Sequence, residues 1–121
     1  MDDAIHSAAR TYALHIVLAR RQHLTVGRLG DFTFPAGRYI YTGSARKNLA
    51  ARVKRHLSTD KKLRWHIDYL LASPSASVVL VQLFDKDECL VNQHHGGVVV
   101  VPRFGASDCR QGCGSHLKRL S

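Results

Sequence analysis

Residues 38–56, RYIYTGSARKNLAARVKRH, combine two tyrosines, a glycine–serine step and a series of cations. Tyr39 and Tyr41 are two residues apart, so a strand would direct both phenols to one face. Gly43-Ser44 ends this pattern, and a basic helix with Ser44 as its N-cap is expected to follow. The segment is either an ordinary strand-to-helix junction with a solvated helix or the floor of a site that binds phosphates.

The basic segment has helical spacing over residues 45–58. Its apolar stripe consists of Leu49, Val53 and Leu57. Arg52 and His56 are four residues apart along one border of this stripe, where packing can hold both side chains while their polar ends reach a groove. On spacing alone, a solvated face and a functional role are equally supported for Arg52 and His56, whereas a solvated face is favoured for Arg46, Lys47 and Lys54. The candidate nucleic-acid contacts are these last three cations and Arg55, which lies on the same side as Arg52 and His56.

Composition indicates the class of partner. A chain of 121 residues with 45% hydrophobic content fits one folded domain with a modest core. Eighteen Lys and Arg against nine Asp and Glu give a net charge of +9. This balance favours a polyanionic partner, with nucleic acid first and an anionic membrane surface second.

Three further features predict a cytoplasmic protein. No apolar run approaches the roughly 20 residues that a membrane helix needs. The start, Met1-Asp2-Asp3, is acidic where a secretory signal would be basic. The three cysteines are an odd number without a disulfide framework, which suits a reducing compartment.

The order of elements predicts an α/β domain with a small, mainly antiparallel sheet flanked by helices. Strands are expected at 12–19, in a hairpin within 24–37, and at 38–43, 77–84 and 98–101, with 77–84 in a central position. Helices are expected at 45–58, after Asp60 with Leu63, Ile67, Leu70 and Leu71 on one face, and from Asp85 to His95. The last residues show no clear periodicity.

Glu88 has two interpretations. Asp85 and Glu88 have the spacing of a capping box, in which Glu88 would bond the N-cap amide. Alternatively, its carboxylate could hold a hard divalent cation together with water molecules. Without further information the residues favour capping.

A second constellation contains sulfur. Cys109, Cys113 and His116 lie close in sequence, with Cys89 and His66 elsewhere in the chain. Thiolates and imidazole could bind zinc, but the spacing is not that of paired CxxC motifs and the fourth ligand is open. The glycines of FGASDCRQGCGSH favour tight turns instead, and Asp108 is a possible second acidic group near the site.

Several motifs together resemble a known superfamily. TYAL at 11–14, YTG at 41–43, and Arg52 with His56 on the following helix are similar to the GIY-YIG nucleases. YIYTGSA, WHIDYLL, FGASDC and SHL, in this order, resemble the small branch long described as a domain of unknown function, which in some archaea is joined to an endonuclease III-like glycosylase. The resemblance implies a nuclease-like domain at 10–121 after a tail at 1–9, with a three-stranded antiparallel sheet.

The resemblance also implies site residues. Tyr12 and Tyr41 match the two motif tyrosines near the attacking water and the scissile phosphate. Arg52 matches the arginine that neutralises the phosphate's charge, and His56 matches a candidate for proton transfer or phosphate contact. Glu88 matches the acidic ligand of one divalent metal, Mg²⁺ or Mn²⁺, so with the resemblance metal binding leads over capping.

The sequence departs from the superfamily pattern at three places. Arg10 replaces the first-motif glycine and Thr42 the second-motif isoleucine. The late asparagine has no clear match, and three residues are candidates to replace it: Asn92, Ser115 and His116.

Two classes of function follow. The first is a metal-dependent endonuclease that cleaves phosphodiester bonds in DNA, single-stranded, damaged or branched. Tyr12 then has two possible roles. Arg52 and a bound metal together could lower the pKa of its phenol enough for it to act as a base, or Tyr12 could simply orient the attacking water. The second is a basic nucleic-acid-binding module with the same fold and no cleavage. Protein partners and oligomeric state are left open by the sequence.

Overall fold

The computed structural model describes residues 9–45, 48–58, 62–105 and 113–121, and all structural statements below concern these residues. The helices are η1 (Gly27–Leu29, a 3-10 turn), α2 (Leu49–Leu57), α3 (His66–Leu71) and α4 (Glu88–His94). The strands are β1 (Thr11–Leu18), β2 (Gln22–Val26), β3 (Gly30–Phe34), β4 (Gly37–Ser44), β5 (Ala76–Phe84), β6 (Val98–Val99) and β7 (Leu117–Arg119). The predicted α/β class with an antiparallel sheet is confirmed.

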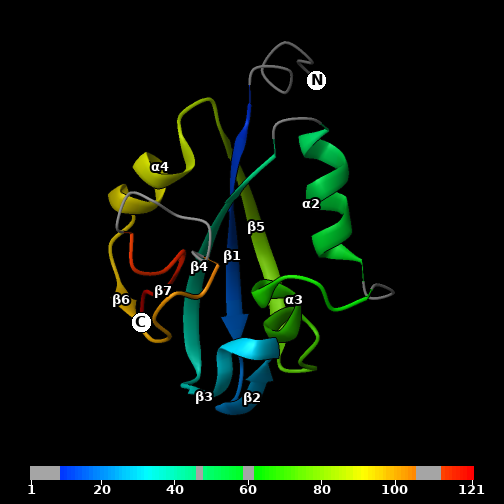
Figure 1. Ribbon diagram of the computed structural model, residues 1–121, viewed down its shortest axis with the longest axis vertical. Coiled ribbons are helices and arrows are strands. Elements are labelled where there is room, and N and C mark those ends of the chain that lie inside the picture. The colour runs from blue at the N-terminus through cyan, green and yellow to red at the C-terminus, as the bar shows by residue number, and fades with distance from the viewer. Residues whose placement is uncertain (1–8, 46–47, 59–61, 106–112) are drawn as a thin grey trace.

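The main sheet has the strand order β5-β1-β4-β7-β6, and β2 and β3 form a separate hairpin. It is larger than the three strands expected, because β5 and the C-terminal β7 and β6 flank the β1–β4 pair. Figure 1 shows α2 and α4 on either side of the end where β1 begins and β4 ends. In that register Thr11 faces Ser44 and Tyr12 faces Gly43.

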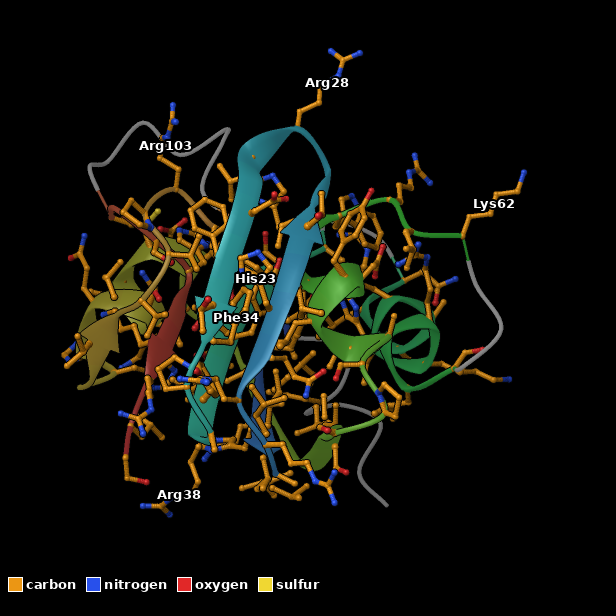
Figure 2. The ribbon with its side chains drawn as sticks, turned by 90° about the horizontal axis from the view of Figure 1, so that it is seen from below. His23, Arg28, Phe34, Arg38, Lys62 and Arg103 are labelled. Carbon is orange, nitrogen blue, oxygen red and sulfur yellow. The ribbon has the colours of Figure 1, made fainter. Side chains whose placement is uncertain are left out.

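One face of the sheet carries the core. Alternate residues of β1 supply Tyr12, Leu14, Ile16 and Leu18, each at most 1% exposed. They pack in one cluster with residues of the hairpin, of α2 and α3, and of the segment around Phe104. Figure 2, seen from below, shows the β2–β3 hairpin passing beside α3, with Phe34 on β3.

The structure corrects the expected start of the first long helix. Helix α2 begins at Leu49, and its N-cap is Asn48, whose side chain accepts a hydrogen bond from the Ala51 amide. Ser44 is instead the last residue of β4. A strand that continues to this point leaves no room for the helix to begin at residue 45.

Two more expectations about helices were wrong. Helix α3 is short and begins after Trp65, so Leu63 precedes it and is 47% exposed. Asp60, expected as its cap, lies outside the described residues. The cap of α4 is Asp87, whose carboxylate accepts from the Cys89 amide, so Glu88 is not the N3 partner of a capping box begun by Asp85.

The apolar strand 77–84 is at an edge of the sheet, not at its centre. Its pairing with β1 shifts register between His15 and Ile16. This irregularity accompanies the exposure of Val79 (61%) and Leu80 (50%). The continuous apolar run of β5 therefore does not correspond to a strand that is buried on both faces of the sheet. Among the described residues, no helix is long and apolar enough to cross a membrane.

Candidate active site

The five residues predicted for catalysis come from four elements that meet where β1 begins and β4 ends. Tyr12 lies on β1, Tyr41 on β4, Arg52 and His56 on α2, and Glu88 is the first residue of α4. Because β1 and β4 are antiparallel, Tyr12 and the end of β4 are neighbours in the ladder. The sheet therefore brings the beginning of α2 and the beginning of α4 to the same end of the molecule (Figure 1).

Tyr12 and His56 are in direct contact. The Tyr12 hydroxyl lies 2.6 Å from His56 Nε2, and the ring centroids are 5.3 Å apart. Tyr41 packs against both, with centroids 6.4 Å from Tyr12 and 6.2 Å from His56. Tyr12 is 1% exposed and His56 3%, so both side chains are almost fully buried.

Two glycines make room for the phenols. A Cβ at Gly43 would lie 2.4 Å from the Tyr12 hydroxyl oxygen, so the ring of Tyr12 occupies the space of the missing side chain. A Cβ at Gly105 would lie 2.8 Å from a ring carbon of Tyr41, and Gly105 also has a positive φ of 66°. The glycine of YTG is therefore required by its neighbour on β1.

The Arg52 charge does not by itself lower the pKa of the Tyr12 phenol. Burial raises the pKa of the Tyr12 phenol well above its ordinary value of 10.0, and the nearby Arg52 charge offsets only part of this effect while Glu88 adds to it. Burial likewise raises the pKa of Tyr41 well above the ordinary value, with Tyr12 and Glu88 contributing. Both tyrosines are neutral hydrogen-bonding groups at physiological pH.

Ser44 joins Arg52 to Glu88. Its backbone carbonyl accepts a hydrogen bond of 3.0 Å from Arg52 Nη1, and its hydroxyl donates a hydrogen bond of 2.5 Å to Glu88 Oε1. The other oxygen of Glu88, Oε2, lies 2.5 Å from His116 Nδ1. The Glu88 side chain is 26% exposed, so its carboxylate is fixed in place while water still reaches it.

Trp65 is the centre of an arginine cluster. The guanidinium carbons of Arg52 and Arg55 lie 4.5 Å and 4.2 Å from its ring centroid, and that of Arg64 lies at 5.5 Å. The His56 ring is also adjacent, at 5.7 Å. Trp65 thus orients Arg52 through a cation–π contact.

Arg55 is engaged within the protein. Its guanidinium donates two hydrogen bonds of 3.0 Å to the carboxylate of Asp68, which is fully buried. Burial acts to raise the pKa of Asp68, but hydrogen bonds from Arg55 and from the Trp65 and Arg64 amides outweigh it and hold the pKa below 3.8. Of the other predicted nucleic-acid contacts, Lys54 is exposed on α2, and Arg46 and Lys47 lie outside the described residues.

The candidates for the missing asparagine have different environments. Asn92 is buried and donates to the Ser115 carbonyl, and Ser115 donates to the Leu117 carbonyl. His116 is the one of the three that contacts Glu88. Ser44 is a site neighbour that sequence reasoning did not identify, because it was interpreted as a helix cap.

Some of the cysteines and histidines considered as zinc ligands lie close together in the structure. One ligand atom from each of Cys89, Cys113 and His116 lies within 4.8 Å of the others. Cys109 and Asp108 lie outside the described residues. His66 does not join this group, because its Nδ1 accepts a hydrogen bond from the Gly105 amide and its ring packs on Phe104.

Comparison with known proteins identifies a family of unknown function. A family model described as "Domain of unknown function DUF123" matches residues 11–121. The chain belongs to this family. No curated protein and no solved structure matches it. The predicted membership of a family described as a domain of unknown function is confirmed, and the relation to GIY-YIG nucleases is an inference from the motifs alone.

Proposed function

We propose that this protein is a metal-dependent endonuclease of the GIY-YIG type that cleaves phosphodiester bonds in DNA. The observation that carries the proposal is the convergence at one end of the sheet of a phenol–imidazole pair, an arginine and a partly exposed carboxylate. Ser44 links the last two groups directly. These groups come from residues that are distant in sequence, and the sequence motifs predicted each of them.

The proposed roles follow from the chemistry of phosphodiester cleavage. The phosphate anion repels a nucleophile, so catalysis depends on cations that neutralise charge in the transition state. Arg52 supplies a planar, permanently charged donor, and its contacts with Ser44 and Trp65 orient it. We infer that Arg52 binds the non-bridging oxygens of the scissile phosphate.

Tyr12 and His56 handle the proton. A neutral phenol cannot remove a proton from water unless it gives its own proton to another group. Its hydroxyl lies 2.6 Å from His56 Nε2, so the Tyr12 oxygen accepts the proton of the attacking water while the phenol proton moves to the imidazole. The pair acts as a relay in which His56 ends up carrying the proton.

The donor set at Glu88 fits Mg²⁺ or Mn²⁺. These ions take a carboxylate oxygen and keep several waters, and Glu88 is a fixed carboxylate that solvent reaches. A metal ion bound there would neutralise phosphate charge as a Lewis acid. Ser44 donates one hydrogen bond to Oε1 and His116 Nδ1 lies beside Oε2, so each oxygen keeps a lone pair for a cation.

Glu88→Gln tests the proposal. The variant keeps the size of the side chain and removes its charge, so cleavage of single-stranded, nicked or duplex DNA should fall by at least about 100-fold. DNA binding should be unchanged or slightly tighter, because the variant removes an anion from a basic protein. Wild-type cleavage should require added Mg²⁺ or Mn²⁺ after dialysis.

Asp85→Asn is the matched control, since it makes the same charge change at an exposed position just before α4. Its cleavage rate should equal that of the wild type. A Glu88→Gln variant as active as its parent, or wild-type cleavage that needs no divalent metal, would contradict the assignment.

One observation favours the second candidate, a basic DNA-binding module without cleavage. Tyr12 and His56 are almost fully buried and hydrogen-bonded to each other, as two core residues would be. DNA binding with no cleavage of any substrate form, in either metal, would select this function.

A further inference from the structure

We propose that Cys89, Cys113 and His116 form a zinc site that fastens α4 to the segment leading into β7. The inference does not depend on nuclease activity. Cys89 is the second residue of α4, and Cys113 and His116 lie just before Leu117, where β7 begins. Three donors from two distant parts of the chain therefore meet at one point.

The geometry suits a tetrahedral metal. In such a site, Zn–S bonds of about 2.3 Å place two sulfur ligands about 3.8 Å apart. The three donor atoms lie within 4.8 Å of one another, and Cys89 Sγ is 4.0 Å from His116 Nε2. Movements of about 1 Å would close the site around an ion. Two thiolates and an imidazole are the soft donors that favour zinc over Mg²⁺.

The orientation of His116 supports a metal site. Its Nε2 faces the Cys89 sulfur, while its Nδ1 lies 2.5 Å from the Glu88 carboxylate. Histidines that bind zinc commonly donate the N–H of their other ring nitrogen to a carboxylate, which fixes the tautomer. Here the same contact would also hold Glu88, so zinc would support the position of the candidate catalytic carboxylate.

Two other interpretations of these residues are less consistent with the structure. Thiol, imidazole and carboxylate in this order also occur in cysteine hydrolases. However, Cys89 is only 8% exposed, and a nucleophile needs no second thiol beside it. A disulfide between Cys89 and Cys113 would leave the position of His116 unexplained, and both cysteines are free thiols in the structure.

Zinc binding has chemical consequences that can be measured without DNA. Both thiols lose their protons to solvent when they bind the metal, so affinity should fall at low pH. Bound thiolates should resist alkylation. Because metal binding stabilises the folded state, zinc removal should also lower the unfolding temperature.

The test begins with elemental analysis of protein purified under reducing conditions, where one zinc per chain is expected. Cys89→Ser, Cys113→Ser and His116→Ala should each lose it. Cys113 is only partly buried, so its serine variant should fold even if the other two do not. His23→Ala, which replaces an exposed histidine on β2 (Figure 2), is the control and should retain zinc.

Cobalt substitution and alkylation provide independent readouts. Co²⁺ added to metal-free wild-type protein should give the absorption bands of a tetrahedral thiolate site, and Cys113→Ser should weaken them. Iodoacetamide should modify Cys113, which is only partly buried, after zinc is removed but not before.

Three results would overturn the proposal. The first is purified wild-type protein that contains no zinc and takes up neither Zn²⁺ nor Co²⁺. The second is full zinc occupancy in all three ligand variants. The third is a Cys89–Cys113 disulfide detected by mass in protein that contains no metal.

Discussion

At the residue scale, the contact between Tyr12 and His56 determines how the candidate site can move a proton. The charge of Arg52 acts to lower the pKa of the Tyr12 phenol, and the sequence led us to consider this effect. Burial is the larger influence, because a phenolate loses its hydration when it enters the protein. The base must therefore be a group that accepts the phenol proton, and His56 Nε2 is in position to do so.

Tyr12→Phe removes this relay and little else. We expect cleavage to fall by about 100-fold or more, because proton transfer to a positioned group contributes this much. DNA affinity should be unchanged, and the loss of one buried hydrogen bond should cost about 1 kcal/mol of stability. Single-turnover cleavage, a binding titration and chemical denaturation measure the three effects.

Tyr39→Phe is the matched control for this prediction. Tyr39 is also fully buried, and its hydroxyl donates one hydrogen bond, to the Pro35 carbonyl near the other end of β4. This variant should lose similar stability while it keeps the wild-type cleavage rate. Equal losses of cleavage in the two variants would show that Tyr12 acts through packing alone.

At the element scale, the Arg55–Asp68 pair joins α2 to α3. Asp68 is the third residue of α3, and its carboxylate also accepts hydrogen bonds from the Arg64 and Trp65 amides. One buried side chain therefore fixes the start of α3 and holds the arginine that packs on Trp65. Since Trp65 also orients Arg52, this pair supports the candidate site without belonging to it.

Asp68→Asn should destabilise the protein by about 3 kcal/mol at neutral pH, because it breaks a buried ion pair and weakens the helix start. The folded pKa of Asp68 is lower than its ordinary value of 3.8. Its stabilising contribution is therefore complete above pH 3.8 and is lost as the pH falls through the lower folded value. Denaturation at several pH values should show the difference between variant and wild type narrowing below pH 3.8.

Asp85→Asn, at an exposed position, should unfold like the wild type over the same pH range. A constant difference between Asp68→Asn and the wild type at all pH values would mean that the carboxylate's charge does not contribute.

Most elements could be predicted from local patterns, whereas the limits of the elements and the contacts between them could not. Alternation identified β1, and the tyrosine spacing identified β4. Ser44 has the chemistry of an N-cap, but its hydroxyl has a better partner in Glu88, which is 44 residues away. Long-range hydrogen bonds of this kind leave no periodic signal in a sequence.

In the candidate site, too, some residues could be predicted from the sequence and others could not. Helical spacing placed Arg52 and His56 together, and family motifs selected Tyr12, Tyr41 and Glu88. The role of His116 depends on β7, whose three residues are too few to show alternation. The burial that raises the pKa of Tyr12 also depends on the complete fold, so it could not be predicted from the nearby charge of Arg52.

At the scale of the whole molecule, positive charge is distributed widely. Figure 2 shows Arg28, Arg38, Lys62 and Arg103 extending outward on different sides. A net charge of +9 spread in this way attracts DNA from many directions and favours binding without sequence preference. In the proposed nuclease, selection of the bond to be cleaved would then come from the cations nearest the site.

The dependence of DNA affinity on salt separates these two contributions. The logarithm of the association constant should fall linearly with the logarithm of salt concentration, because each neutralised phosphate releases counterions. Lys54→Ala removes an exposed cation from α2, beside the candidate site, and should reduce the magnitude of this slope by about one. Arg38→Ala removes the same charge at the far end of the β1–β4 ladder from Tyr12, so DNA held at the site should not contact it and the slope should be unchanged. Fluorescence anisotropy over a series of salt concentrations measures both slopes. If both variants reduce the salt dependence equally, DNA binds over the whole surface and α2 has no special part in binding. If the affinity of the wild type does not change with salt, DNA binding does not depend on contacts with the phosphates.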